Sequence, residues 1–203
     1  MASSIHDFSL KKISGGDIKL SDYKGKVVLI ENVEQFGDKL AVLAIPCNQF
    51  GHQTNENDEE FLNTLKYVRP GNGFEPKMDL FAKVNVNGKT ADPLFKYVKA
   101  AKPIPFGGNE DTKDNGCPDN MGLVLSRGGF DATTVNLWAP ALVLSRGGFD
   151  GTTVNLWAPV ARDDIAWNFE KFLIGKDGKV IERFSRYYAT KDIAAHIEKA
   201  IAA

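Results

Sequence analysis

The chain has 203 residues, 43% hydrophobic and 25% charged, which is the balance of a single globular domain with a sizeable core. Its formal net charge of −1 excludes a broad basic surface for nucleic acid or an anionic membrane. Two cysteines, Cys47 and Cys117, are too few for a disulfide scaffold and are not spaced as zinc ligands, so we expect a cytoplasmic protein without a metal site.

The first half of the chain predicts a β-hairpin, two buried strands and a helix. Residues 5–20 alternate loosely between apolar and polar side chains and contain the turn Gly15-Gly16, which favours a hairpin. Residues 26–33 and 40–45 are apolar, β-branched runs typical of buried strands. Residues 57–68 begin with Asn-Asp-Glu-Glu and then place apolar side chains on one face, the pattern of an amphipathic helix.

The second half predicts a strand at 80–86, a helix at 92–101, a hairpin formed by 167–174 and 179–184, and a closing helix at 192–202. Strands that alternate with helices, followed by an antiparallel hairpin, indicate an α/β fold. We therefore expect a mixed central sheet flanked by helices and preceded by an N-terminal β-hairpin.

A tandem repeat interrupts the second half. Residues 123–140 read LVLSRGGFDATTVNLWAP and residues 142–159 read LVLSRGGFDGTTVNLWAP. A solenoid needs about three or more units, so two near-identical copies indicate a recent duplication or an error of sequence assembly. Because a filled core has no room for a second copy, we expect one copy to lead into Trp157 and the other to form a surface loop.

The connection between the two buried strands is too short for its expected role. Central strands of this kind usually run parallel, and a parallel crossover needs about a dozen or more residues. Only residues 34–39 separate the two predicted strands. Six residues can close a hairpin, but the strands would then be antiparallel.

Several motifs resemble those of glutathione peroxidases: PCNQFGHQ at 46–53, KGKVVLIENV at 24–33, LKYVRPG at 65–71 and WNFEKFL at 167–173. They occur in family order, and the resemblance implies one thioredoxin-like domain over residues 1–203, with the duplication at 123–159. Residues 69–76 are similar to the tetrameric, glutathione-using branch, which implies a homotetramer.

The resemblance also exposes a gap. In the family, the strand ending Glu-Asn-Val leads into a loop that holds a selenocysteine or cysteine, and then into the first helix. Here Val33 is followed by Glu-Gln-Phe-Gly, which resembles the end of that helix. The nucleophile loop and most of the helix are therefore absent, and we expect one face of both strands to be exposed and the chain to fold poorly.

Peroxide reduction needs a thiolate or selenolate, and a neutral site stabilises that anion with hydrogen-bond donors. The resemblance assigns these donor roles to Gln49, Trp167 and Asn168, which we expect to meet near the carboxyl ends of the central strands. The residues alone also allow a plainer interpretation, in which Gln49 caps a turn, Trp167 fills the core and Asn168 begins a strand.

The remaining candidates are an arginine and the two thiols. Arginine binds carboxylates bidentately, and by resemblance Arg186 binds glutathione; a solvated surface charge is the alternative. Cys47 could act as a replacement nucleophile, but free cysteines are commonly buried and inert. Acidic neighbours of Cys117 would raise its pKa.

These observations predict a glutathione peroxidase homologue of the antioxidant, oxidative-stress response. The family reaction is reduction of hydrogen peroxide and organic hydroperoxides, with glutathione as co-substrate and no bound cofactor. Because the peroxidatic residue is absent, we expect this form to be inactive. The alternatives are a non-catalytic binding or subunit-modulating homologue, and an active peroxidase that uses Cys47.

Overall fold

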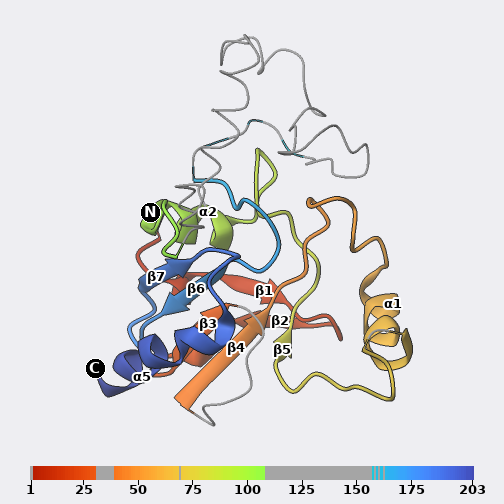
Figure 1. Ribbon diagram of the computed structural model, residues 1–203, viewed down its shortest axis with the longest axis horizontal. Helices are drawn as coiled ribbons and strands as arrows, with labels where there is room; N and C mark the ends of the chain where they lie inside the picture. The colour runs from red at the N-terminus through yellow and green to blue at the C-terminus, as the bar shows by residue number, and fades with distance from the viewer. Residues whose placement is uncertain are drawn as a thin grey trace.

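A five-stranded mixed sheet forms the centre of the computed structural model (Figure 1), which describes residues 2–30, 39–68, 70–107, 157, 159, 161 and 163–203. The strand order is β5-β4-β3-β6-β7. The bounds are β3 Val27–Ile30, β4 Leu40–Ala44, β5 Asp79–Leu80, β6 Lys171–Ile174 and β7 Val180–Phe184. Strands β3, β4 and β5 are parallel, and β6 and β7 are antiparallel to their neighbours. This arrangement confirms the predicted α/β class with a mixed sheet.

Strands β3 and β4 are parallel although few residues connect them. Val27 pairs with Leu40 and Ile30 with Leu43. The interval between Ile30 and Leu40 holds residues 31–39, which could reach about 30 Å if extended. To begin a parallel strand beside β3, the chain must return over the length of that four-residue strand, which is only about 13 Å. A helix is therefore not needed to return the chain, and the antiparallel alternative is wrong.

The strand predicted at 80–86 is much shorter in the structure. Only Asp79–Leu80 pairs with β4, and Phe81 adds a single bridge to Lys12. Beyond this point the backbone leaves the sheet: the Ala82 amide donates to the carbonyl of Lys11. Long-range pairing with the N-terminal hairpin overrides the local β-pattern here.

The N-terminal hairpin consists of β1 (Ser9–Lys11) and β2 (Asp17–Lys19), paired antiparallel as predicted. Gly15 and Gly16 have φ values of 94° and 82° in the turn, a region that residues with a Cβ rarely enter. A short 3-10 turn, Ile5–Asp7, precedes the hairpin and packs Ile5 into the core.

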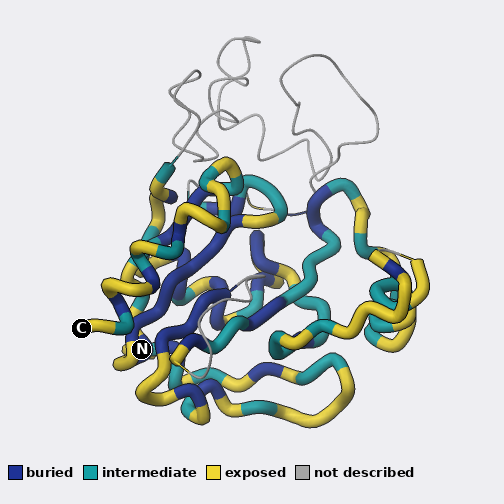
Figure 2. Tube along the Cα trace, turned by 60° about the horizontal axis from the view of Figure 1, so that its bottom comes forward, coloured by how far each residue is buried: buried dark blue, intermediate teal, exposed yellow. Residues whose placement is uncertain are grey.

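Helices α2 (Pro93–Ala101) and α5 (Ala194–Ala202) cover opposite faces of the sheet. Helix α2 confirms the predicted helix at 92–101 and has proline in its first turn. Asp92 caps it by accepting from the Leu94 amide. Buried stretches of the chain run through the middle of the molecule, and exposed stretches lie at its periphery (Figure 2). The α2 face holds the larger core, whose members include Val28, Ile30, Leu43, Phe172, Leu94, Phe95 and Val98. The α5 face includes Val27, Leu29, Leu40, Leu173, Phe184, Ile193 and Ile197.

Burial of the α5 face corrects one expectation. Val27 and Leu29 are 0% exposed and Leu40 is 9% exposed, so the side chains that the missing helix was expected to uncover are largely buried. Ile193 and Ile197 of α5 pack against this face. The argument for poor folding rested on exposed apolar area, and that argument does not hold.

Helix α1 (Asp58–Asn63) continues into a π-helical turn, Thr64–Val68, over the predicted interval. Asn57 and Glu60 form a capping box. However, α1 contains no buried residue, and it lies at the side of the molecule (Figure 1). The amphipathic pattern therefore predicted the helix correctly but not its position, because the apolar face does not enter the core.

The C-terminal hairpin and closing helix are confirmed, with one shift: residues 167–170 precede β6 instead of forming part of it. Of the duplication, only Trp157 and Pro159 belong to the described residues. Trp157 is 6% exposed and packs in the larger core. The predicted surface loop lies outside the described residues. No helix in the described ranges is long and apolar enough to span a bilayer.

Candidate active site

The topology brings three separate segments to one end of the sheet. The chain leaves β4 at Ala44 and reaches Gln49 five residues later. Ile30, the last residue of β3, pairs with Phe172, so the residues before β6 lie beyond the carboxyl end of β3. Phe184, at the end of β7, pairs with Lys171, which brings the following residues to the same end. Parallel strands place functional groups at this end of a sheet.

Gln49 is 4% exposed, and backbone groups hold its side-chain amide. Its Oε1 accepts from the amides of Val86 (2.8 Å) and Asn87 (2.9 Å), and its Nε2 donates to the Asn87 carbonyl (3.1 Å). An amide has two acceptor lone pairs and two donor hydrogens. Within the described part of the chain, one Nε2 hydrogen is therefore left to donate to a substrate or an anion.

Trp167 lies next to the Gln49 segment and beside the predicted substrate arginine. Its ring centroid is 5.7 Å from that of Phe50, the residue after Gln49. The Arg186 guanidinium carbon lies 5.9 Å from the Trp167 ring centroid and 4.6 Å from that of Tyr187. Arg186 Nη2 donates to the Tyr187 hydroxyl, and within the described residues the other in-plane guanidinium hydrogens are available to a carboxylate. No described residue accepts from the Trp167 indole N–H, which remains a donor.

Asn168 lies at the exposed edge of the same site. Its Nδ2 donates to Oε1 of Gln53, at 3.0 Å, from the loop that follows Gln49. Asn48 organises that loop by donating to Asn55 (2.8 Å) and accepting from the Thr54 amide (2.9 Å). The structure thus brings together the segments of all four predicted site residues on one side of the sheet, whereas the roles of those residues stay predictions.

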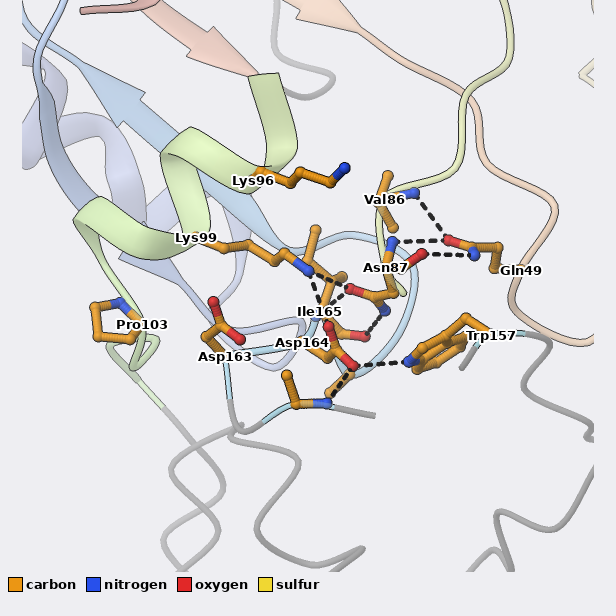
Figure 3. Close-up of polar contacts among 12 residues, drawn as sticks. Gln49, Val86, Asn87, Lys96, Lys99, Pro103, Trp157, Asp163, Asp164 and Ile165 are labelled. Atoms are coloured by element: carbon orange, nitrogen blue, oxygen red, sulfur yellow. Dashed lines mark hydrogen bonds and ion pairs between the residues drawn. The ribbon is translucent and has the colours of Figure 1, made fainter. Parts of the chain in front are cut away.

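A buried polar network, which the sequence analysis did not identify, holds the segment before Trp167 (Figure 3). Lys99 Nζ pairs with Asp164 Oδ1 at 2.9 Å, and both side chains are almost fully buried. Asp164 Oδ2 accepts from the Trp157 indole at 2.8 Å. Lys99 also donates to Asn87 at 3.1 Å. The helical pattern of residues 92–101 gives no signal for such a lysine, because a charge near a helix end normally indicates a solvated surface.

A second buried ion pair anchors the segment on its other side. Arg183 Nη2 lies 2.7 Å from Glu170 Oε2, with both side chains at 1% exposure or less. Burial raises the pKa of the Glu170 carboxyl, while the Arg183 guanidinium and the Ala166 amide act in the opposite direction. The motif around Glu170 was recognised from the sequence, but its partner Arg183 was not.

Backbone strain also marks this segment. Phe169 has φ = 69° although its side chain is 63% exposed. A non-glycine residue in the left-handed region costs free energy, so the surrounding contacts must impose this conformation. Phe169 stands between half-buried Asn168 and buried Glu170.

Cys47 is the free thiol among the described residues, and its environment does not activate it. Burial raises the pKa of the Cys47 thiol, whereas a nucleophilic cysteine requires a lowered pKa. Its Sγ lies 3.6 Å from Gln49 Oε1, an acceptor that favours the protonated thiol. Residues 31–38, where the resemblance places the lost loop, and Cys117 lie outside the described residues.

The site therefore combines available amide and indole donors with a stacked arginine, and the described residues contain no activated thiol. Such donors can stabilise an anion, and the arginine can bind a carboxylate. No group of His, Cys, Asp or Glu that could hold a metal ion occurs in the described ranges.

Comparison with known proteins agrees with this geometry. The family model described as "Glutathione peroxidase" matches residues 34–99. Glutathione peroxidase 1 of Mus musculus and that of Rattus norvegicus are each 38% identical over 216 residues, with coverage of 97% of this chain and 90% of the relative.

Solved structures give the same fold. The crystal structure of Trgpx in apo form is 25% identical, with a TM-score of 0.54 and coverage of 99% of this chain and 97% of that chain. The structure of T. cruzi GPX1 is 21% identical, with a TM-score of 0.52 and coverage of 98% and 97%, and it supports the thioredoxin-like fold alone. The extent of the sequence similarity shows that the chain belongs to the glutathione peroxidase family.

Proposed function

We propose that this chain is a glutathione peroxidase homologue that retains the donor set and the substrate arginine but lacks the peroxidatic residue. In the family reaction, two glutathione thiols supply two electrons and two protons. The O–O bond of a hydroperoxide breaks to give an alcohol and water, and the two thiols become a disulfide. In this form, Arg186 binds glutathione. Gln49, Trp167 and Asn168 keep the positions of the supporting donors, and turnover does not occur.

The observation that carries this proposal is that hydrogen-bond donors for an anion are available at the site, whereas the thiol beside them is not activated. Gln49 and Trp167 each keep a hydrogen that no described residue accepts, as anion stabilisation requires. The thiol beside them, Cys47, is partly buried and has a raised pKa. Donors without a thiolate or selenolate cannot supply electrons to a peroxide.

Two measurements test this proposal. Peroxide consumption with glutathione should stay at background, and calorimetry should detect glutathione binding. Arg186→Met should weaken that binding about tenfold or more, because a charge-assisted hydrogen bond contributes roughly 1.5–3 kcal/mol. Lys191→Met, which removes an exposed charge elsewhere, is the control. Turnover that disappears in Cys47→Ser would instead make Cys47 the nucleophile, and absence of glutathione binding would refute the binding role.

We also propose that the chain assembles, with copies of itself as a homotetramer or with another chain as a modulating subunit, through the turn Thr64–Val68 and the loop of residues 69–76 after it. Tyr67 is 69% exposed, Val68 73% and Phe74 39%, which is unusual for large apolar side chains grouped in sequence. Light scattering should show a mass above that of a monomer, and Tyr67→Ser with Val68→Ser should reduce it. Ile181→Ser, at an exposed apolar site on β7, should leave the mass unchanged.

We further propose that the chain acts in the cytoplasm during the response to oxidative stress. Family membership and the unpaired thiol of Cys47 support this proposal, since reducing compartments keep thiols free. Fractionation of cells before and after peroxide exposure tests it. Recovery in a membrane or secreted fraction, or an unchanged abundance after exposure, would contradict it.

A further inference from the structure

Asn87 lies fully buried between the two halves of the site, in the stretch between β5 and α2 (Figure 3). Its backbone forms a two-point contact with the side-chain amide of Gln49. The Asn87 N–H donates to Gln49 Oε1 at 2.9 Å, and the Asn87 carbonyl accepts from Gln49 Nε2 at 3.1 Å. These paired bonds fix both the distance and the orientation of the Gln49 amide.

The side chain of Asn87 repeats this arrangement on the opposite side. Its Nδ2 donates to the Ile165 carbonyl at 2.8 Å, and its Oδ1 accepts from the Ile165 amide at 2.9 Å. Ile165 precedes Trp167 by two residues. One residue therefore joins the loop that carries Gln49 to the segment that carries Trp167 and Asn168, although Asn87 and Ile165 are 78 positions apart in the sequence.

The surroundings make this connection specific. Asn87 is 0% exposed, so water does not compete for these hydrogen bonds, and a residue without an amide would leave the Ile165 backbone groups unpaired. Lys99 Nζ also donates to Asn87 Oδ1, at 3.1 Å. This third contact identifies Oδ1 as the oxygen and therefore orients the Asn87 amide, because an ammonium can only donate.

We propose that Asn87 is a positioning residue, which holds Gln49 at a fixed place relative to Trp167 and Asn168. The proposal rests on the proposed function only in treating these three side chains as one donor set. It predicts that loss of the Asn87 amide displaces Trp167 and Asn168, which Asn87 does not contact directly.

The test is nuclear magnetic resonance of the ¹⁵N-labelled chain without glutathione, observing the Trp167 indole N–H and the Asn168 side-chain amide. Asn87→Ala should move or broaden both signals. Asn85→Ala is the matched control, because Asn85 is exposed, lies two residues away and donates to Thr90. It should leave both signals unchanged. Because no glutathione is present, this result does not depend on whether the chain binds it.

Ile197→Ala separates positioning from a general loss of stability. Ile197 is fully buried, but it packs on the other face of the sheet, so its loss destabilises the fold and should change the two signals less. If Asn87→Ala does not fold, Asn87→Asp replaces it, because the aspartate keeps the acceptor and loses the donor to Ile165, and Lys99 Nζ, at 3.1 Å from Oδ1, can pair with the added charge. Unchanged signals in a folded Asn87 variant, or equal changes in Ile197→Ala, would overturn the proposal.

Discussion

Replacing Arg183 by methionine should strongly destabilise the fold, because this guanidinium satisfies an entire buried cluster. Arg183 is 0% exposed, and its Nη2 and Nε lie 2.7 and 2.8 Å from Glu170 Oε2. It also donates to the carbonyls of Lys102 (3.3 Å), Pro103 (2.9 Å), Asp163 (2.9 Å) and Asp164 (3.1 Å). Methionine fills a similar volume but provides no donor, so Glu170 Oε2 and four carbonyls lose this partner.

The expected loss is large relative to the whole stability. Removing one partner of a buried ion pair costs about 3–5 kcal/mol, and a typical domain is stable by about 5–15 kcal/mol. Protonation of Glu170 can reduce this cost, because burial already raises its pKa. At neutral pH we therefore expect the lower part of the range, about 3 kcal/mol.

Urea unfolding, followed by circular dichroism and tryptophan fluorescence, measures the effect. Lys179→Met is the control, since Lys179 Nζ lies 3.5 Å from Asp177 Oδ2 and both side chains are mostly exposed; such a pair contributes at most about 1 kcal/mol. The double variant Arg183→Met with Glu170→Leu should recover part of the loss, because neither charge of this ion pair then remains. A loss below about 1 kcal/mol in Arg183→Met, or no recovery in the double variant, would refute the reasoning.

Three further predictions concern single side chains, each with a direct measurement. Because Phe169 has φ = 69°, the free energy of unfolding of Phe169→Gly, measured with urea, should exceed that of Phe169→Ala by about 1 kcal/mol. The reverse order would contradict imposed strain. Burial raises the pKa of the Cys47 thiol above the ordinary 9.0, so with the other cysteine replaced by serine, Cys47 should react with iodoacetamide at pH 8 more slowly than a free thiol. Through the same group, the native state should lose stability only as the pH rises beyond 9.0. Labelling of Cys47 at the free-thiol rate would contradict the raised pKa. Gly178→Ala should lower the melting temperature more than Gly25→Ala, because both have positive φ but only a Cβ at 178 would come within 2.7 Å of His6; equal decreases would show that the ring moves aside.

Local sequence rules predicted most elements of the fold. Gly15-Gly16 marked the first turn, Asp92 with Pro93 marked the start of α2, and the buried runs marked β3 and β4. Each of these signals depends on nearby residues, so a linear inspection can find it. The family motifs likewise supplied the four predicted site residues, because each motif is a contiguous run, although their roles stay predictions.

Contacts between distant residues decided the rest. The family resemblance predicted Gln49 and Trp167 as site residues and a missing nucleophile loop, but no sequence pattern indicated that Asn87 joins the segments of Gln49 and Trp167 or that Arg183 is buried. It also suggested a bare sheet face, which α5 covers in the structure. The physical reason is the same in each case: local patterns reveal which backbone conformation a segment favours, whereas burial and the pairing of polar groups depend on which distant segment packs against it.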